Sequence, residues 1–199
     1  MRKLVFDAVT TLGTALGANA VPVLGVLLAG WQAETALLLY VLETVIAILL
    51  VALRIRILAP AYEEVPGRGQ LRRRRMIGDY LIFALGFVGV TSVFILFFIG
   101  MSTQGALNLD GLRTGATLIL GILLAGFVVD LVTLYPASLV ECEGLMNATL
   151  GRVAVLYFAV FIGVVAAMFD AGWFLLPFVA LKTMIDVGRP IQFVAARLR

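Results

Sequence analysis

The sequence predicts an all-α integral membrane protein, a single domain of six transmembrane helices with both termini in the cytoplasm. Hydrophobic residues make up 62% of the 199 residues. The mean hydropathy of +1.10 is far above that of soluble domains, whose apolar content is about 45–50%. Six runs are long enough to cross a bilayer, which takes about 20 mostly apolar residues. The basic residues gather at one set of run ends.

The expected spans are separated by short polar connections and one long one. They cover about residues 7–29, 34–58, 78–100, 114–135, 152–169 and 173–189. The first span is the most polar, and it begins like a secretory signal peptide, with basic residues before an apolar stretch. Asp7 interrupts that stretch and the hydrophobic run continues to Ala29, so we expect the segment to remain as a span.

The connections carry residues typical of turns and membrane interfaces. Gly30-Trp31-Gln32 predicts a tight turn between the first two spans, with Trp31 at the level of the interface. Residues 59–77 contain two prolines and predict the one long polar loop. Residues 137–151 are mixed in character and suit a short interfacial helix.

Small residues four apart indicate close helix packing. Gly13 and Gly17 in the first span, and Gly121 and Ala125 in the fourth, fit the small-xxx-small pattern of membrane helix contacts. With six spans to pack, we expect these pairs inside the bundle, with a homo-oligomer interface as the alternative.

The positions of arginine and lysine orient the predicted bundle. All but two of the 15 basic residues fall on one side, the exceptions being Arg113 on the other side and Lys182 inside a span. By the positive-inside rule the basic side faces the cytoplasm. An even number of spans then places both termini there.

A run of four arginines stands in the predicted long loop: Arg72, Arg73, Arg74 and Arg75. Such a run is first of all a topology determinant. It also fits anionic lipid head groups as partners, at about 1 kcal/mol for each basic residue near the surface.

Composition excludes several kinds of chemistry. The chain has no histidine and a single cysteine, Cys142. Histidine-ligated haem, zinc and copper sites and histidine general-base catalysis are therefore absent, as are an intrachain disulfide and a thiolate cluster. We expect no metal and no cofactor. The net charge of +3 lies at the ends of apolar runs and not in a patch, so we expect no nucleic-acid partner.

Away from the outermost turns of the spans, four ionisable residues are candidates for the hydrocarbon interior, where such residues are costly: Glu43, Asp130, Lys182 and Asp186. Glu43 and Lys182 are about 13 Å from the outer ends of their spans, and Asn19 is at a similar depth, near the midplane of a core about 30 Å thick. Asp130 is about 8 Å from the cytoplasmic end of the fourth span. Asp186 is four residues beyond Lys182, so the two share a helix face and can pair.

These residues support two interpretations. They form either a polar centre that binds an ion, a proton or a small polar ligand, or a structural network that fixes helix register. Pro22 removes a helix hydrogen bond close to Asn19 and frees the carbonyl of residue 18. That interruption is either a broken helix of the kind found at transporter sites or a simple proline kink.

Several segments together resemble one family of membrane proteins. They are Asn19-Ala-Val-Pro22-Val-Leu-Gly25-Val, Gly30-Trp31, Tyr40-Val-Leu-Glu43, Gly151-Arg152-Val-Ala-Val-Leu156 and Leu181-Lys182-Thr183-Met-Ile-Asp186. The chain resembles a prokaryotic multi-pass family known only as a domain of unknown function, with the patterns N-x-x-P-x-x-G-V, G-W, Y-x-x-E, R-v-x-v-L-H and L-K-T-x-x-D. The resemblance covers the first two and last two spans.

The resemblance implies a location in the prokaryotic inner or plasma membrane and favours a functional reading of four polar residues: Asn19, Glu43, Lys182 and Asp186. The family tends to carry histidine near the positions of Tyr157 and Arg189. This chain has none there, which puts a metal or histidine-relay mechanism in doubt.

Three classes of function fit the sequence. The leading hypothesis is a small transport or permeation protein with a polar site at mid-membrane. The alternative is a non-catalytic scaffold or accessory subunit in which buried charges serve assembly. An intramembrane enzyme is the third, but no catalytic residues are identified, and the Glu63-Glu64…Arg68 spacing of one protease family falls in a loop and lacks partner histidines.

Overall fold

The structure is a computed structural model, described here for a defined set of residues. They are 2–58, 68–101, 107–134, 144–147, 149–151, 153–154, 157–158, 180 and 183–184. Within this set every residue is helical except at the connections 30–32 and 107–108, and there is no strand. The predicted all-α class is therefore confirmed for the part of the chain that the structure describes.

Four long helices make up most of the described chain: α1 (Arg2–Ala29), α2 (Ala33–Leu58), α3 (Arg68–Met101) and α4 (Leu109–Leu134). Each contains a segment long and apolar enough to cross a membrane: Leu12–Ala29, Ala33–Ile57, Arg74–Phe97 and Leu109–Val132. These match the first four predicted spans. The predicted spans 152–169 and 173–189 lie almost entirely outside the described residues.

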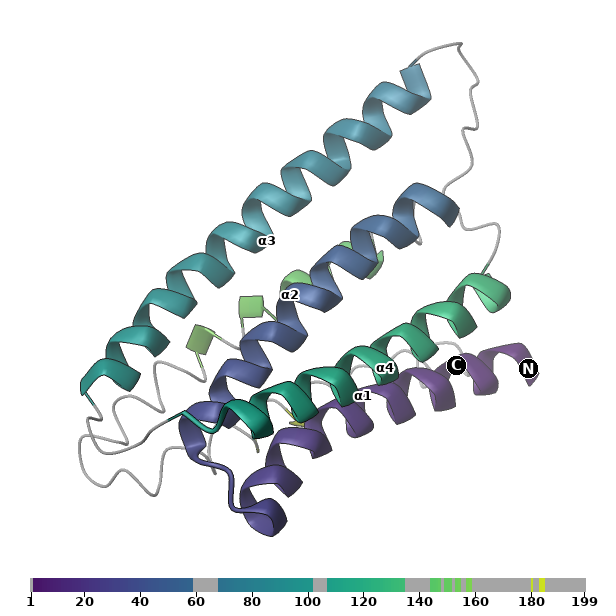
Figure 1. Cartoon of the computed structure of the whole chain (residues 1–199). Helices are drawn as coiled ribbons and strands as arrows, with labels where there is room; N and C mark the ends of the chain where they lie inside the picture. The colour runs from purple at the N-terminus through teal and green to yellow at the C-terminus, as the bar shows by residue number, and fades with distance from the viewer. Residues whose placement is uncertain are drawn as a thin grey trace.

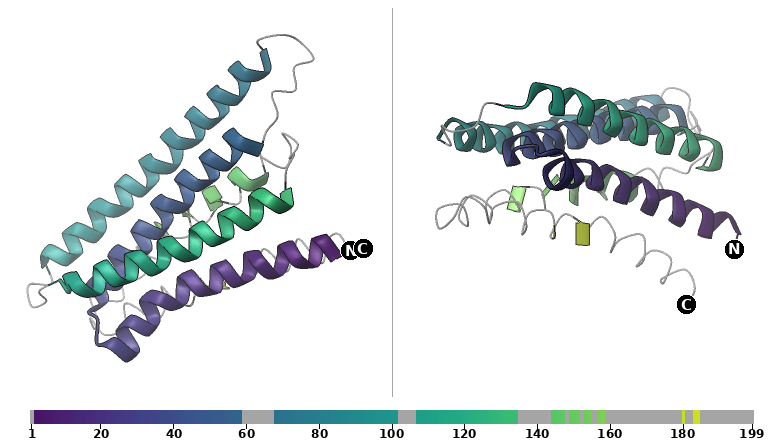
Figure 2. Two further views of the ribbon diagram at one scale, coloured as in Figure 1. Left: turned by 45° about the vertical axis from the view of Figure 1, so that its right-hand side comes forward. Right: turned by 60° about the horizontal axis from the view of Figure 1, so that its bottom comes forward.

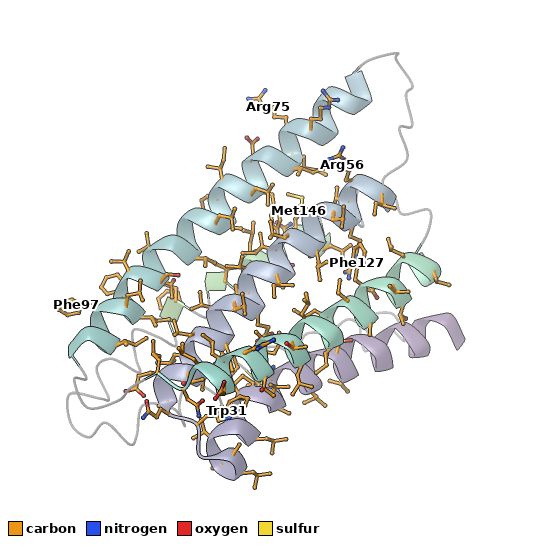
Figure 3. The ribbon with its side chains drawn as sticks, in the orientation of Figure 1. Trp31, Arg56, Arg75, Phe97, Phe127 and Met146 are labelled. Carbon is orange, nitrogen blue, oxygen red and sulfur yellow. The ribbon has the colours of Figure 1, made fainter. Side chains whose placement is uncertain are left out.

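The four helices run alternately up and down (Figure 1). Helix α2 contacts α1, α3 and α4, and α4 also contacts α1. The order across the bundle is α3, α2, α4 and α1 (Figure 2). We call the end with the α1–α2 turn and the start of α4 the Trp31 end. The opposite end, which holds Arg56 and Arg75, is the arginine end (Figure 3).

A cluster of buried apolar residues lies between α2 and α3. Its buried members are Ile48, Val51, Ala52 and Ile55 of α2, Tyr80, Ala84 and Val88 of α3, and Val153. Met146 and Leu150 pack against it. Because residues 146, 150 and 153 are four and three apart, they fit one helical face. Part of the region expected as an interfacial helix thus packs on this cluster.

Close contact between α1 and α4 depends on glycine. A Cβ atom on Gly126 would lie 2.7 Å from Thr14 Oγ1, and one on Gly17 would lie 3.5 Å from Ile122. Lipid tails are as apolar as leucine, so membrane helices associate largely through such close packing. Gly17 therefore faces α4 inside the bundle, as expected. Gly13 is exposed, with nothing within 4 Å of a Cβ there, so the first predicted pair is confirmed only at Gly17.

The expectation that the other small-residue pair packs inside the bundle was wrong. Gly121 and Ala125 are exposed, and nothing lies within 4 Å of a Cβ on Gly121. The buried side of α4 carries Gly111, Gly115, Ile119 and Gly126 instead. At 3.6 residues per turn the predicted pair lies roughly 100° around the helix from this face. A second small-residue pattern in the same helix was the correct one.

Two helices begin earlier than predicted. Residues 68–77 were expected in the loop, but α3 begins at Arg68. After Gly69 this stretch contains good helix formers and no proline, so the helix continues past the hydrocarbon into polar sequence. Helix α4 begins at Leu109 and not near 114, because Asn108 caps it: its Oδ1 accepts the Gly111 N–H at 2.8 Å.

A pair of alanine substitutions in α4 tests the packing. We expect Gly126→Ala to lower the free energy of unfolding by about 1–3 kcal/mol, because the methyl group overlaps the stiff side chain of Thr14. Gly121→Ala, with open space around it, should be neutral or stabilising by up to about 1 kcal/mol. Thermal unfolding in detergent measures both, and equal effects at the two positions would contradict this packing.

Candidate functional site

The Trp31 end is fixed by one ring in a cradle of glycines. Gly30 ends α1 with φ of 66°, in the left-handed region that glycine adopts readily. The Trp31 N–H donates to the Gly25 carbonyl at 3.0 Å, and the chain turns back at this point (Figure 3). A Cβ on Gly25 would overlap the indole, and Cβ atoms on Gly111 and Gly115 would lie 2.9 and 3.0 Å from it. The ring predicted at the interface therefore packs between α1 and α4.

A tyrosine of α2 contacts α1 at the turn that contains Pro22. Helix α1 continues without a break from Arg2 to Ala29, so the alternative of a broken helix was wrong. Pro22 lies inside α1 and has no N–H to give to the carbonyl of Ala18. Beside this position the hydroxyl of Tyr40 donates to the backbone carbonyl of Asn19 at 3.2 Å. Tyr40 is fully buried and Asn19 is 3% exposed. The bond therefore joins α1 and α2 inside the bundle, at the turn that proline weakens.

Glu43 lies one turn beyond Tyr40 on α2 and is buried, with 8% of its surface exposed. A carboxylate is costly in hydrocarbon, and this burial shows that Glu43 faces the interior of the bundle. It is about 15 Å from the start of α2, which is half the thickness of a hydrocarbon core. Next to it the Thr44 hydroxyl donates to the Tyr40 carbonyl at 2.8 Å. We call Asn19, Tyr40, Glu43 and Thr44 the polar centre.

Asp130 pairs with an arginine at the other end of α2 from the polar centre. Its carboxylate forms an ion pair with Arg54 of α2, and the two side chains are 19% and 13% exposed. The Arg54 guanidinium also lies over the Phe127 ring, 5.7 Å from its centroid, a cation–π geometry. Arg54 is about 16 Å along α2 from Glu43. The structure thus brings Asp130 to the arginine end and not to the predicted ligand group.

The remaining predicted site residues are described only in part. Lys182 and Asp186, with their proposed pairing, lie outside the described residues. Of the four-arginine run, Arg74 and Arg75 have described side chains, and both are exposed. Arg75 lies 3.9 Å from Asp79 in an exposed ion pair. Among the described residues no group of three acidic, cysteine or histidine side chains is arranged to hold a metal ion.

Sequence reasoning missed Tyr40 and Arg54 as partners of the polar residues. Tyr40 precedes Glu43 by three residues, so one helical face carries both, and that spacing was a usable signal. Arg54 and Asp130 each lie four residues from the end of their helix at the arginine end. Equal depth on two neighbouring helices could have predicted their pairing.

Removing one member of the Arg54–Asp130 pair should be costly. We expect Arg54→Met or Asp130→Leu to lower the free energy of unfolding by about 3–5 kcal/mol, because the other charge is left in an apolar setting. The double variant should recover most of this loss. Arg75→Met, which breaks an exposed pair, should change stability by no more than about 1 kcal/mol.

Unfolding in detergent gives these values. A double variant as unstable as the sum of the two single variants would show that the two side chains do not act as a pair.

Comparison with known proteins places the chain in a family. No curated protein and no solved structure matches it. The sequence model of one family, described as a family of unknown function (DUF6498), matches residues 1–199. This agrees with the resemblance to a domain of unknown function. The chain therefore belongs to the DUF6498 family, and its described part is a helical bundle whose four long helices are apolar enough to cross a membrane.

Proposed function

We propose that the protein is a multi-pass membrane protein that binds a small polar solute or ion at the polar centre and lets it pass the membrane. The observation that carries this proposal is the burial of Glu43 halfway along α2. A carboxylate at that depth is expensive and marks a functional site by default. It lies one turn from Tyr40, whose hydroxyl donates to the Asn19 carbonyl of α1, so polar groups of two helices meet beside the carboxylate.

A scaffold or accessory subunit is the second candidate, and two contacts favour it. The Arg54–Asp130 ion pair joins α2 to α4, and the Tyr40–Asn19 hydrogen bond joins α2 to α1. Groups that fasten neighbouring helices fix register and need no ligand. In that case the polar centre would serve assembly alone.

For the topology we propose six spans with both termini in the cytoplasm, in the cell membrane of a prokaryote. The alternating direction of the four long helices supports this arrangement (Figure 1). It brings Arg54, Arg56 and the arginines of α3 to one end and leaves Arg113 at the other. The positive-inside rule then assigns the arginine end to the cytoplasm. We keep Lys182 and Asp186 as proposed members of the ligand group, entering from the sixth span.

Anionic lipid head groups are the partners that we propose for the arginine end. Helix α3 has 34 residues, about 51 Å, so it extends beyond a hydrocarbon core of about 30 Å. The arginines Arg72 to Arg75 fall in this extension, and the described side chains of Arg74 and Arg75 are exposed. Phosphate groups of anionic lipids lie at this level of a bilayer.

Replacing Glu43 tests the function. In reconstituted vesicles we expect Glu43→Gln to lose most of the flux of those alkali cations or small polar solutes that wild type carries, because the neutral amide removes the buried charge. Asp79→Asn, which changes a 74% exposed carboxylate at the arginine end, is the control and should keep wild-type flux. Wild-type flux in Glu43→Gln would contradict the proposal. A wild-type protein that carries none of the panel would favour the scaffold.

Cysteine labelling tests the topology. In a Cys142→Ser background, we expect Gly69→Cys at the arginine end to resist a membrane-impermeant thiol reagent added to intact cells and to react after permeabilisation. Asp110→Cys, at the exposed start of α4 on the other end, should react in intact cells. Labelling of position 69 from outside would overturn the proposed orientation.

A further inference from the structure

Two buried side-chain oxygens at the start of α2 have no hydrogen-bond partner. They are Oε1 of Gln32 and Oγ1 of Thr35. Thr35 is 0% exposed. A buried oxygen left unpaired costs about 1–3 kcal/mol, and nearly all buried polar groups in proteins are paired. Two on successive turns, among the described residues, therefore call for a partner from outside the chain that supplies the missing interactions.

These oxygens lie on the same side of α2 as Glu43. Gln32 directly precedes α2. Residues 32 and 43 are 11 apart, close to three helical turns, so they lie on the same side of the helix about 16 Å apart. Thr35 lies one turn along from Gln32, within about 60° of the same face. The neighbouring positions Ala36, Leu39 and Tyr40 are fully buried. The side of α2 that carries the carboxylate thus presents oxygen atoms from its first turn onward.

The chemistry of the three side chains selects a cation. An amide oxygen, a hydroxyl oxygen and a carboxylate are the ligands that hard cations prefer. The positive N-terminal end of the α2 dipole repels a cation. The carboxylates of Glu34 in the first turn of α2 and Asp110 in the first turn of α4 offset this repulsion. Arg113 is the one basic residue among those described near this end. Gln32 and Thr35 offer neutral oxygens, which suit a singly charged cation better than a divalent one, whose sites are built largely from carboxylates.

We propose that Gln32 and Thr35 form a binding site for a small monovalent cation, an alkali ion or an ammonium group, in line with Glu43. The site rests on the proposed function and adds to it the class of ligand and a second binding position near the Trp31 end. An ordered water molecule could also satisfy two such oxygens. The experiment distinguishes the two occupants.

The test uses the purified full chain, titrated with sodium, potassium or ammonium chloride at constant ionic strength, with the melting temperature as readout. In Thr35→Val and Gln32→Met, side chains of similar size lose the oxygen. We expect both variants to keep or exceed the wild-type melting temperature without these cations, because an unpaired buried oxygen is removed. Their apparent affinity for the cation should fall about tenfold.

Thr91→Val is the matched control. Thr91 is buried on α3, and its hydroxyl already donates to the Phe87 carbonyl at 2.9 Å. The variant should keep the wild-type cation affinity. Wild-type affinity in Thr35→Val and Gln32→Met would overturn the cation site and assign the two oxygens to water. A lower melting temperature of both variants without cations, at unchanged affinity, leads to the same conclusion.

Glu43→Gln separates this inference from the proposed function. If Glu43→Gln abolishes the cation response while Thr35→Val keeps it, the site at the start of α2 is overturned and the function stands. If wild type carries neutral solutes and ignores every cation, the ligand class is overturned. If wild type neither responds to nor carries any member of the panel, both proposals are overturned together.

Discussion

The close approach of α4 to α1 and α2 is the constraint on which the rest of the described bundle depends. In lipid the helices gain little from hiding apolar surface, since the surrounding chains are equally apolar. Attraction must come from dispersion contacts that fall off within an ångström of their optimum. Four glycines allow this approach: Gly25 and Gly111 beside Trp31, Gly115 beside Trp31 and Leu39, and Gly126 beside Thr14.

Because the helices pack this closely, polar groups that face the bundle interior need partners on neighbouring helices. Tyr40 lies within 3.2 Å of the Asn19 carbonyl, and Arg54 meets Asp130 across the α2–α4 contact. Each partner lies on a different helix, so each bond also fixes the relative height of two helices. A slip by one turn, about 5.4 Å, would break both. Packing by glycine sets the distance between helices, and these bonds set their register.

From the sequence, the positions of the helices along the chain could be predicted better than the face that each helix turns toward its neighbours. An apolar run must be as long as the hydrocarbon core is thick, so hydropathy located four spans to within a few residues. The helical extension at Arg68 was missed, because charged residues mark the membrane surface and not the end of a helix. The burial of Asn19 and Glu43 followed from depth and cost alone. Their neighbour Tyr40 and the Arg54–Asp130 pair did not, because partners depend on which face each helix turns inward. The misassigned pair Gly121 and Ala125 had the same cause.

The bundle contains buried polar groups of two kinds, paired charges and unpaired oxygens, and the difference between them bears on function. At the arginine end, Arg54 and Asp130 neutralise each other, which is what assembly requires. At the Trp31 end, Gln32 Oε1 and Thr35 Oγ1 are buried and lack hydrogen-bond partners. A helix contact gains nothing from such oxygens, since unpaired groups weaken it. The contrast favours a ligand for the Trp31 end and a structural role for the arginine end, within a single chain.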